Sequence, residues 1–524
     1  MEPSLRKSMA LLHTWAGVVL GSVLFAIFWM GTLSVFDKEI DRWMMPTTRV
    51  SMPDAAVSLD KVVLPLIETS KLSGNQWGVT LPSERAPVFT LRYRTEQGDN
   101  IRRYINPHNG EITDERYTLG ATGFFFPFHF RLHIQWLKLG YWIVGLAAMG
   151  MLVLLVSGVI IHKKIFTDFF TFRPQKAMQR SALDLHNLSG VLALPFHFVI
   201  TLSGLIIFAA TYFPNTNKLV YAGDKAAYEV EMTGRYDIKP AGKPGQLASL
   251  DAMLAQASQL WGGGQPYFLR VRNAGDAHAY VEIRRSYEQD VTMNLDTIYF
   301  DGISGEVLSR FEAKPVLTVQ RYIAGMHFIQ FNHWPLRWLY FLAGLSGCIL
   351  IATGFLFWLE ARRVRHAKQG LKGVVIVQGL TIGSVTGIII ATLMFLLANR
   401  WLPANAALQG YERDALEAWV FYLSWLATFA HAWLRSRAAW REQAWLISLL
   451  ALFTIASNAV TTGTPLWHSL AGHDYATAGM DVVLLLGAIL AAYAALKLGQ
   501  RKSTSQHKKA TPTSSSSIGL GKHE

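Results

Sequence analysis

Long apolar segments without charges constrain this chain more than any other feature. A hydrocarbon core of about 30 Å needs roughly 20 apolar residues in each crossing helix. Eight segments reach that length, although Glu417 blurs the start of the sixth. The sequence therefore predicts about eight membrane-spanning helices, at about 13–36, 139–161, 187–213, 337–359, 374–397, 416–434, 443–462 and 479–498.

Composition agrees with an integral membrane protein, because 51% of the 524 residues are hydrophobic and only 16% are charged. The first apolar segment resembles a signal peptide, with Arg6 and Lys7 before it. It is too long for one, however, and it ends at Phe36-Asp37-Lys38-Glu39 without a small-residue cleavage site. We interpret it as a retained helix.

The net charge of +13 follows a topological pattern and gives no reason to expect a nucleic-acid partner. Lys and Arg gather in alternate loops, as the positive-inside rule predicts for cytoplasmic segments. We therefore expect a multi-pass protein of the bacterial inner membrane, in contact with lipid and with both termini cytoplasmic. One cysteine, Cys348, excludes disulfides and thiolate metal sites within the chain. The basic clusters are Arg6/Lys7, Lys163/Lys164, Arg173, Lys176, Arg180, Arg362, Arg363, Arg365, Lys368, Arg435, Arg437, Arg441, Arg501, Lys502, Lys508 and Lys509.

Two long segments between spans have the pattern of strands joined by Gly, Asn and Asp turns. They predict two periplasmic α+β domains, each with an antiparallel hairpin, on a mainly α-helical membrane protein. The C-terminal segment is rich in Ser, Thr and Lys, which predicts a disordered cytoplasmic tail. The expected divisions are 1–36 (first span), 37–138 (first domain), 139–213 (spans two and three), 214–336 (second domain), 337–365 (span four), 366–498 (four-helix membrane region) and 499–524 (tail).

An internal repeat organises the first two thirds of the chain. Leu12-His13-Thr-Trp-Ala-Gly17 matches Leu185-His186-Asn-Leu-Ser-Gly190, and Phe128-His129-Phe130 matches Met326-His327-Phe328. The repeated unit is therefore helix, external domain, helix. Such repeats usually place function at the interface between the copies.

These elements resemble the PepSY-associated transmembrane family over about residues 5–365. The resemblance lies in the His-x-x-x-Gly starts at His13 and His186, the His129-Phe-Arg-Leu-His133 run, and the Thr353-Gly354 end of span four. Asn106-Pro-His-Asn-Gly-Glu111 and Asp301-Gly-Ile-Ser-Gly-Glu306 look like the turns of PepSY domains. The run from Leu185 to His197 is similar to a subset of the family that acts on ferric siderophores.

The resemblance implies an oxidoreductase that contains haem b, with two haems expected. It would pass electrons from the inside to a periplasmic ferric siderophore and release ferrous iron. The sequence has no G-x-G-x-x-G after a strand and no P-loop, so electrons must come from a separate cytoplasmic donor or from membrane quinol. Accessory proteins of iron uptake are further expected partners.

Histidines inside the predicted spans support haem binding independently of the family resemblance. Haem b needs only axial ligands that project into a helical bundle. His197 lies in the middle of the third span. On one straight helix, His186 would share its face at a separation of roughly 16 Å. The alternative is that His197 bonds a neighbouring carbonyl.

Repeat symmetry suggests further ligands. His13 and His186 are equivalent, so a pseudo-twofold axis would bring them together at the cytoplasmic side. His129 and its repeat partner His327 would form an outer site, joined by His133 if 129–133 is helical. The alternative for His13 and His186 is an interfacial position beside lipid headgroups.

Each predicted hairpin carries four arginines that could present forked donors to an anionic chelate. A solvated outer face with local Asp and Glu partners explains the same pattern, and we favour that interpretation. The arginines are Arg92, Arg94, Arg102 and Arg103 in the first hairpin and Arg270, Arg272, Arg284 and Arg285 in the second.

Two rival functions fit the same architecture. One is a transporter that carries iron or its siderophore across the membrane. The other is a non-enzymatic binding or protease-regulating protein, since PepSY domains also occur in protease propeptides. Neither rival needs histidines at stacked depths.

Overall fold

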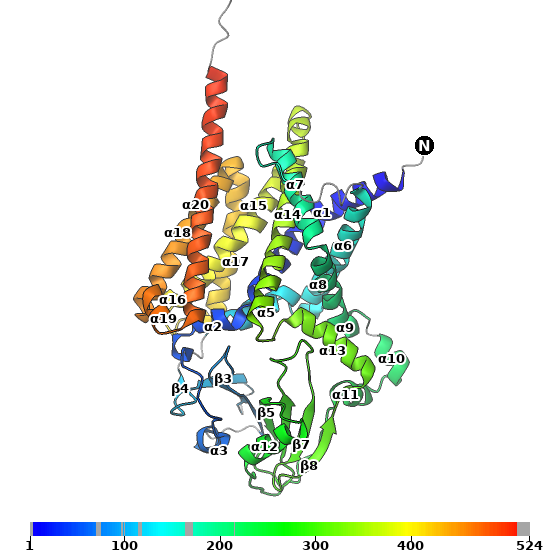
Figure 1. The fold of residues 1–524 in the computed structure, drawn as a ribbon, viewed down its shortest axis with the longest axis vertical. Helices are drawn as coiled ribbons and strands as arrows, with labels where there is room; N and C mark the ends of the chain where they lie inside the picture. The colour runs from blue at the N-terminus through cyan, green and yellow to red at the C-terminus, as the bar shows by residue number, and fades with distance from the viewer. Residues whose placement is uncertain are drawn as a thin grey trace, which may run out of the picture.

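A bundle of long helices carries a β-sheet at one end (Figure 1). The computed structural model describes residues 4–69, 75–95, 98, 100–113, 118–162, 171–213 and 215–510. Helix α1 (Leu5–Ser34) begins at the end of the bundle opposite to the sheet, and α20 (Tyr475–Ala510) finishes there. Helix α20 thus includes the first part of the segment predicted as a tail; residues 511–524 and the Lys163/Lys164 pair lie outside the described residues.

Six helical segments are long and apolar enough to cross a membrane, and a bent pair raises the number to as many as seven. The chain is therefore a multi-pass membrane protein. The six segments are Leu5–Ser34, Trp136–Ile161, Trp334–Lys368, Gly373–Trp401, Arg437–Thr462 and Tyr475–Gln500. They contain α1, η2 (Trp136–Lys138) with α6 (Leu139–Ile161), α14 (Trp334–Lys368), α15 (Gly373–Ile382) with η3 (Gly383–Gly387) and α16 (Ile388–Trp401), α18 (Arg437–Thr462) and α20.

The third predicted span is not one straight helix. It consists of α7 (Met178–Leu192) and α8 (Leu194–Ile207), which meet at a bend of 65°. Pro195 lies in the first turn of α8, where its fixed φ and missing N–H favour the start of a new helix. The sequence prediction of a continuous helix over 187–213 is therefore wrong.

The sixth predicted span forms a helix of the expected length, α17 (Arg413–Arg435). Its first turns contain Arg413, Asp414 and Glu417, and it does not meet the length-and-hydropathy criterion that the six segments meet. The remaining helices are short: α2 (Asp37–Met44), η1 (Pro46–Thr48), α3 (Leu59–Val62), α4 (Leu64–Thr69), α5 (Gly120–Arg131), α9 (Ala209–Tyr212), α10 (Asn215–Tyr221), α11 (Lys225–Thr233), α12 (Leu250–Leu260), α13 (Pro315–Phe328) and α19 (Leu466–Ala471).

Both external segments contribute to a single eight-stranded sheet of order β4-β3-β2-β1-β5-β6-β7-β8. Strand β1 pairs antiparallel with β5, which joins the hairpins of the two repeats edge to edge. A pair of two-residue strands, β9 (Ala407–Leu408) and β10 (Tyr411–Glu412), lies elsewhere. The strands of the large sheet are β1 (Gln76–Thr80), β2 (Phe89–Arg94), β3 (Asn100–Ile105), β4 (Ile112–Thr113), β5 (Pro266–Arg272), β6 (Tyr280–Arg285), β7 (Thr297–Asp301) and β8 (Val307–Phe311).

One face of this sheet is apolar and packs under α3 and α12. Alternation along the strands sends Trp77, Val79, Leu269 and Val271 to that face, where all four are buried. Leu250 of α12 belongs to the same core. The opposite face therefore holds the polar side chains.

In the membrane region, α1, α6, α7–α8 and α14 pack against one another, and the C-terminal helices α15–α20 pack beside them. Hydrogen bonds tie the C-terminal helices to the first part of the chain: Trp29 of α1 donates to Thr392 Oγ1 at 3.0 Å, and Trp43 of α2 donates to the Asp481 carboxylate at 2.8 Å. A shared apolar core runs between them.

A buried ion cluster joins the sheet segment to the bundle. Both oxygens of Glu39 accept from Arg85 at 3.0 Å, and they also accept from Arg337 at 3.0 and 2.8 Å. Arg337 is fully buried at the start of α14, under the rings of Phe36 and Trp334. Burial alone would raise the pKa of Glu39, but the charges and hydrogen bonds of the two arginines lower it to about 2.

Replacing Glu39 by glutamine should destabilise the fold by about 3–5 kcal/mol, because the buried Arg337 loses its anion and Arg85 keeps only Asp37, at 3.2 Å. The folded pKa lies below the ordinary value of 4.5. The stabilisation is therefore full above about pH 4.5 and is lost as the pH falls toward about 2. Thermal unfolding in detergent should show a large difference from wild type at neutral pH that shrinks over this range.

Glu229→Gln is the matched control, because the Glu229 carboxylate pairs with Arg235 at the exposed surface. It should leave the unfolding temperature unchanged. A loss of stability in Glu39→Gln that does not depend on pH would contradict the assignment of the effect to the charge of Glu39.

Candidate functional site

Four histidines of the repeat meet in two pairs. The ring centres of His13 in α1 and His186 in α7 are 6.2 Å apart, and those of His129 in α5 and His327 in α13 are 5.9 Å apart. Each pair joins equivalent positions of the two copies, as the repeat predicts. We call them the inner pair (His13 and His186) and the outer pair (His129 and His327).

Three of the four rings direct Nδ1 to a backbone carbonyl on a neighbouring helix. The Nδ1–O distances are 3.0 Å from His13 to Leu154, 2.8 Å from His186 to Leu350 and 2.8 Å from His129 to Ile27. A ring that donates from Nδ1 keeps its lone pair on Nε2. Nε2 is then the atom of these three rings that can ligate a metal, as it is in many metal sites with such supporting bonds.

His327 differs in detail. Its Nδ1 is 3.1 Å from Ser203 Oγ, and the backbone of Ile200 also faces the ring. Ser203 is itself bonded to the carbonyl of Val199 at 2.6 Å, so its hydroxyl proton is already used. Its oxygen can still accept from His327, which again favours a proton on Nδ1.

A glycine stands next to every one of these rings. A Cβ added at Gly31 would lie 2.7 Å from His129, and one at Gly204 would lie 2.8 Å from His327. At Gly158 it would lie 3.3 Å from His13, and at Gly354 it would lie 3.1 Å from His186. All four glycines therefore leave space that the imidazole rings occupy.

Each glycine lies four positions after the backbone group that faces the ring: Ile27 and Gly31, Leu154 and Gly158, Ile200 and Gly204, Leu350 and Gly354. In an α-helix the carbonyl of residue i already accepts from the N–H of residue i+4. A side chain at i+4 would cover that carbonyl, whereas glycine leaves its second lone pair open. The glycine thus leaves room for the imidazole ring and exposes the carbonyl that accepts its hydrogen bond.

The two pairs lie at different depths. Gly31, which touches His129, follows His13 by 18 positions on α1, so the two levels are roughly 27 Å apart along that helix. That separation is close to the thickness of a hydrocarbon core, about 30 Å. One pair therefore lies toward each side of the membrane-spanning region.

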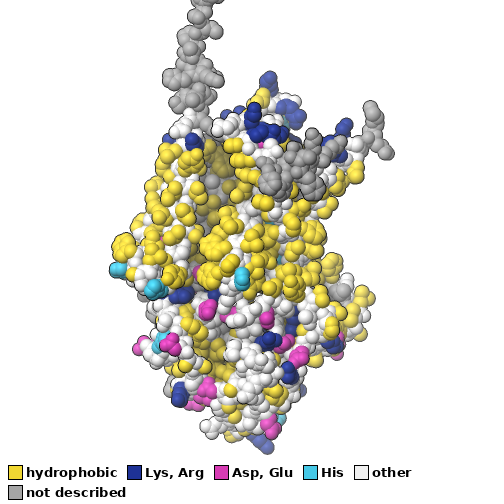
Figure 2. Space-filling model, viewed as in Figure 1, with side chains coloured by type: hydrophobic (Ala, Val, Ile, Leu, Met, Phe, Trp, Pro, Cys, Tyr) yellow, Lys and Arg dark blue, Asp and Glu magenta, His cyan; other side chains and the backbone are white. Residues whose placement is uncertain are grey.

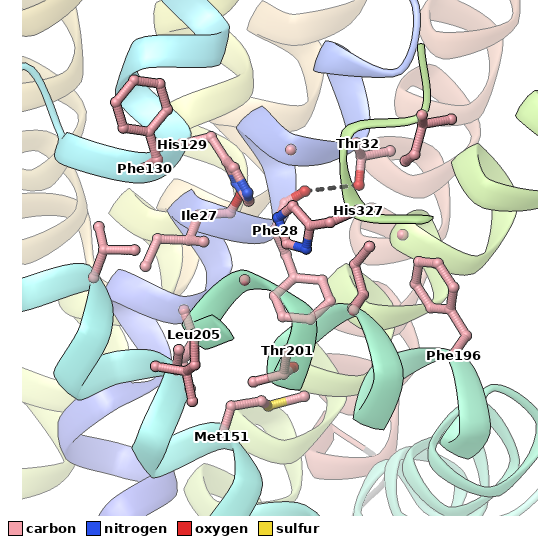
Figure 3. A pocket seen from close by; sticks show the side chains of 18 of the residues that line it. Ile27, Phe28, Thr32, His129, Phe130, Met151, Phe196, Thr201, Leu205 and His327 are labelled. Carbon is pink, nitrogen blue, oxygen red and sulfur yellow. Dashed lines mark hydrogen bonds between the residues drawn. The ribbon is translucent and has the colours of Figure 1, made fainter. Parts of the chain in front are cut away.

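The outer pair lines a small apolar cleft of about 120 Å³. Figure 3 shows His129 and His327 beside one another at this cleft, with Phe28 between His327 and Thr201. Most of the lining is aliphatic or aromatic, from α1, α6, α8 and α14. Its further lining residues include Leu24, Ile27, Met151, Phe196, Leu205, Phe208 and Tyr340.

His133 does not join the outer pair. Helix α5 ends at Arg131, and His133 follows in the left-handed conformation with φ of 54°. Its Nε2 bonds the carbonyl of Phe124 at 2.8 Å, and its ring stacks on Phe124. The expectation that 129–133 is one helix with both histidines on a shared face is therefore wrong.

His197 is fully buried but stands apart from both pairs. Its ring contacts Phe28 and Phe196, and Gly347 leaves room for its Nε2. The backbone of Ala343 is near, yet neither ring nitrogen meets hydrogen-bond geometry with any described residue. The bend between α7 and α8 also removes the straight-helix argument that placed it on the face of His186.

The eight predicted arginines divide between the two faces of the sheet. Leu91, which is in the apolar core, is paired with Arg103, and Arg285 follows Arg284 by one position, so Arg103 and Arg285 lie on the core side. The other six share the polar face: Arg92, Arg94, Arg102, Arg270, Arg272 and Arg284.

The histidine pairs are the candidate metal ligands of this chain. No cluster of three or more His, Cys, Asp or Glu is found in the part of the chain that the structure describes.

Sequence reasoning missed Gly31, Gly158 and Gly204, used Gly354 only as part of the family resemblance, and missed the carbonyls that all four glycines uncover. A signal was present, because Ser157, Ser203 and Thr353 each precede one of these glycines, and Gly31 and Gly204 follow His13 and His186 by the same 18 positions. The repeat could have revealed them if it had been extended beyond the histidines.

This chain is thus a multi-pass membrane protein in which a helix–domain–helix unit occurs twice and brings histidines together in pairs. Residues 10–361 match the model of the PepSY-associated TM region, and the chain belongs to that family. It is also similar to a protein of Pseudomonas aeruginosa described as uncharacterized. The two are 28% identical over 287 residues, which cover 50% of this chain and 69% of that relative.

Gly204→Ala should destabilise the protein by about 1–3 kcal/mol, because the new methyl group overlaps the His327 ring and covers the backbone of the preceding turn. Thermal unfolding in detergent measures this loss. Gly487→Ala in α20 is the control, since a Cβ there meets nothing within 4 Å. That variant should be as stable as wild type or slightly more stable. Equal stability of the two variants would contradict the close packing of His327 on Gly204.

Proposed function

We propose that this chain is a haem-b oxidoreductase of the bacterial inner membrane that passes electrons to a periplasmic ferric siderophore. One observation carries the proposal: two pairs of membrane histidines at different depths, with their rings fixed through Nδ1. Two haems are proposed, one for the inner pair and one for the outer pair.

The residues fit that cofactor. Two imidazoles that bind opposite sides of one metal, each at about 2 Å, have ring centres roughly 6 Å apart. The inner and outer pairs have 6.2 and 5.9 Å. The lining beside the outer pair is apolar, as the surroundings of a haem macrocycle are, and haem b needs no thiolate ligand. His13 and His186 would hold one group, and His129 and His327 the other.

When bound, haem supplies reversible one-electron transfer at a potential set by its axial ligands and surroundings. The chain contributes the rest. Carbonyls of Leu154, Leu350 and Ile27 keep the ligand rings in one tautomer and orientation. Aliphatic and aromatic side chains around the outer pair exclude water from it.

The direction of transfer follows from charge. Figure 2 shows Lys and Arg gathered at the end of the bundle opposite to the sheet, beyond a broad hydrophobic belt. By the positive-inside rule that end is cytoplasmic, which puts both chain ends inside and the sheet in the periplasm. The inner pair then faces the donor, either quinol or a cytoplasmic protein, and the outer pair faces the ferric substrate. Accessory iron-uptake proteins could receive the ferrous product.

One observation favours a second candidate, a siderophore or iron transporter. The 65° bend between α7 and α8 breaks a span within the membrane region, and broken helices often line transport sites. Helix α8 also lines the cleft beside the outer pair. Against this candidate, the repeat runs parallel, and a transporter needs no paired histidines.

An absorption spectrum of the purified protein tests the proposal. Wild type should show a Soret band when oxidised and sharp α and β bands after reduction with dithionite, with two haems per chain. His129→Ala/His327→Ala and His13→Ala/His186→Ala should each retain about half of the haem, because each double variant removes both histidines that would hold one group.

His468→Ala is the matched control, because His468 is exposed and distant in sequence from both pairs. It should keep the full haem content. A colourless protein purified from haem-replete cells would refute the oxidoreductase. If that protein moved a redox-inert gallium chelate into proteoliposomes, the transporter would take its place.

A further inference from the structure

The two hairpins build one continuous arginine face across the sheet. Reading across neighbouring strands, Arg102 pairs with Arg92, Arg92 with Gly78, Gly78 with Arg270, and Arg270 with Glu282. These residues come from β3, β2, β1, β5 and β6, so they form one row on the polar side. Both repeats contribute to it, and neither copy alone could form it.

Glycine interrupts the row at its centre. Gly78 of β1 stands between Arg92 and Arg270 and has no side chain of its own. Strands are about 4.8 Å apart, so the two arginine backbones are roughly 10 Å apart. The ring of Phe268 lies over Gly78, since a Cβ there would be 3.1 Å from it. Arg92 and Arg270 thus stand on the two sides of a position that has Phe268 as its floor, which we call the Gly78 notch.

Negative charge on this face is scarce near the notch. Glu282 pairs with Arg270 at 3.4 Å and also with Arg284. Arg92 and Arg272 form no ion pair within the ranges that the structure describes. The expectation of local carboxylate partners is therefore met at Arg270 and Arg284, which share Glu282, and is not met at Arg92 and Arg272.

The arginines repel one another and are held in place by aromatic rings. Arg92 is accessible to solvent yet partly enclosed by protein, and its pKa is lowered first by desolvation and then by the charges of Arg102 and Arg270. The guanidinium groups of Arg270 and Arg284 lie 5.1 and 5.3 Å from the ring of Phe268. Rigid, mutually repelling cations are suited to an anion that bridges them.

The β3 side of the face touches the bundle. Arg102 donates to the carbonyl of Thr118 at 2.8 Å, just before α5, the helix that carries His129. Tyr104, two positions further along β3, is buried in the core that includes Phe124 of α5. The arginine face and the outer pair are thus connected through one short helix.

We propose that the Gly78 notch, with Arg92 and Arg270 as its main contacts, binds an anionic metal chelate of small-molecule size. As the docking place of the electron acceptor it rests on the proposed function, but as an anion site it does not. Forked donors on both sides match the oxygen-rich, negatively charged surface of a catecholate or carboxylate complex. Neutral chelates of the same metal should bind poorly.

Gallium chelates test the site without any redox chemistry. The full-length protein, in an uncharged detergent, would be titrated by calorimetry with a trianionic gallium(III) tris-catecholate and with a neutral gallium(III) tris-hydroxamate. We expect the trianion to bind and the neutral complex to bind at least about tenfold more weakly. Arg92→Gln/Arg270→Gln should weaken binding of the trianion by about tenfold or more, since it removes two charge-assisted hydrogen-bond donors.

The matched control is Arg103→Gln/Arg285→Gln. It removes the same charge from neighbouring positions of the same hairpins, but on the opposite face. It should bind the trianion within about twofold of wild type, and circular dichroism should show that both variants fold. Equal losses in the two variants, equal binding of the two chelates or no binding by wild type would each overturn the proposal.

The outcome is separable from that of the proposed function. Gallium(III) accepts no electron under these conditions, so a haem-free preparation can still give a positive result. Binding of the trianion by a colourless protein would leave the anion site standing and remove the oxidoreductase. A normal haem spectrum without chelate binding would support the oxidoreductase and overturn the anion site.

Discussion

A second hydrogen bond to a helix carbonyl is the interaction on which the arrangement of histidines depends. An imidazole inside hydrocarbon must satisfy its N–H, because an unpaired polar group is expensive there. Helix carbonyls are already used once and are normally hidden by the side chain one turn later. Glycine at that position exposes the carbonyl and admits the ring, and this happens beside Gly31, Gly158, Gly204 and Gly354.

These hydrogen bonds link helices that carry histidines to one another. The helix that holds His13 also supplies the carbonyl of Ile27 to His129, and α6 supplies Leu154 to His13. In the second copy, α14 supplies Leu350 to His186. Every ring is therefore held by an element other than its own, and displacing one helix would disturb histidines at more than one level. The repeat is a repeat of these contacts as well as of sequence.

Much of the architecture could be predicted from the sequence, because hydrophobic length and repeat symmetry are local or periodic signals. They located most spans and placed His13 with His186 and His129 with His327. Haem, the siderophore and the membrane orientation stay predictions. The bend at Pro195 and the left-handed turn at His133 were missed, because both depend on where a helix ends. The joining of two hairpins was missed because a strand's sequence does not reveal its distant partner.

The pairing of β1 with β5 has a consequence for biogenesis. Strand β1 is synthesised with the first external segment, yet its partner β5 follows only after α6, α7 and α8. Until then β1 has an open edge, which is the kind of surface that recruits wrong partners. Completion of the sheet requires both external segments to be on the same side of the bundle. A chain stalled between the two copies would display an unpaired strand, a feature that quality-control proteases and chaperones can recognise.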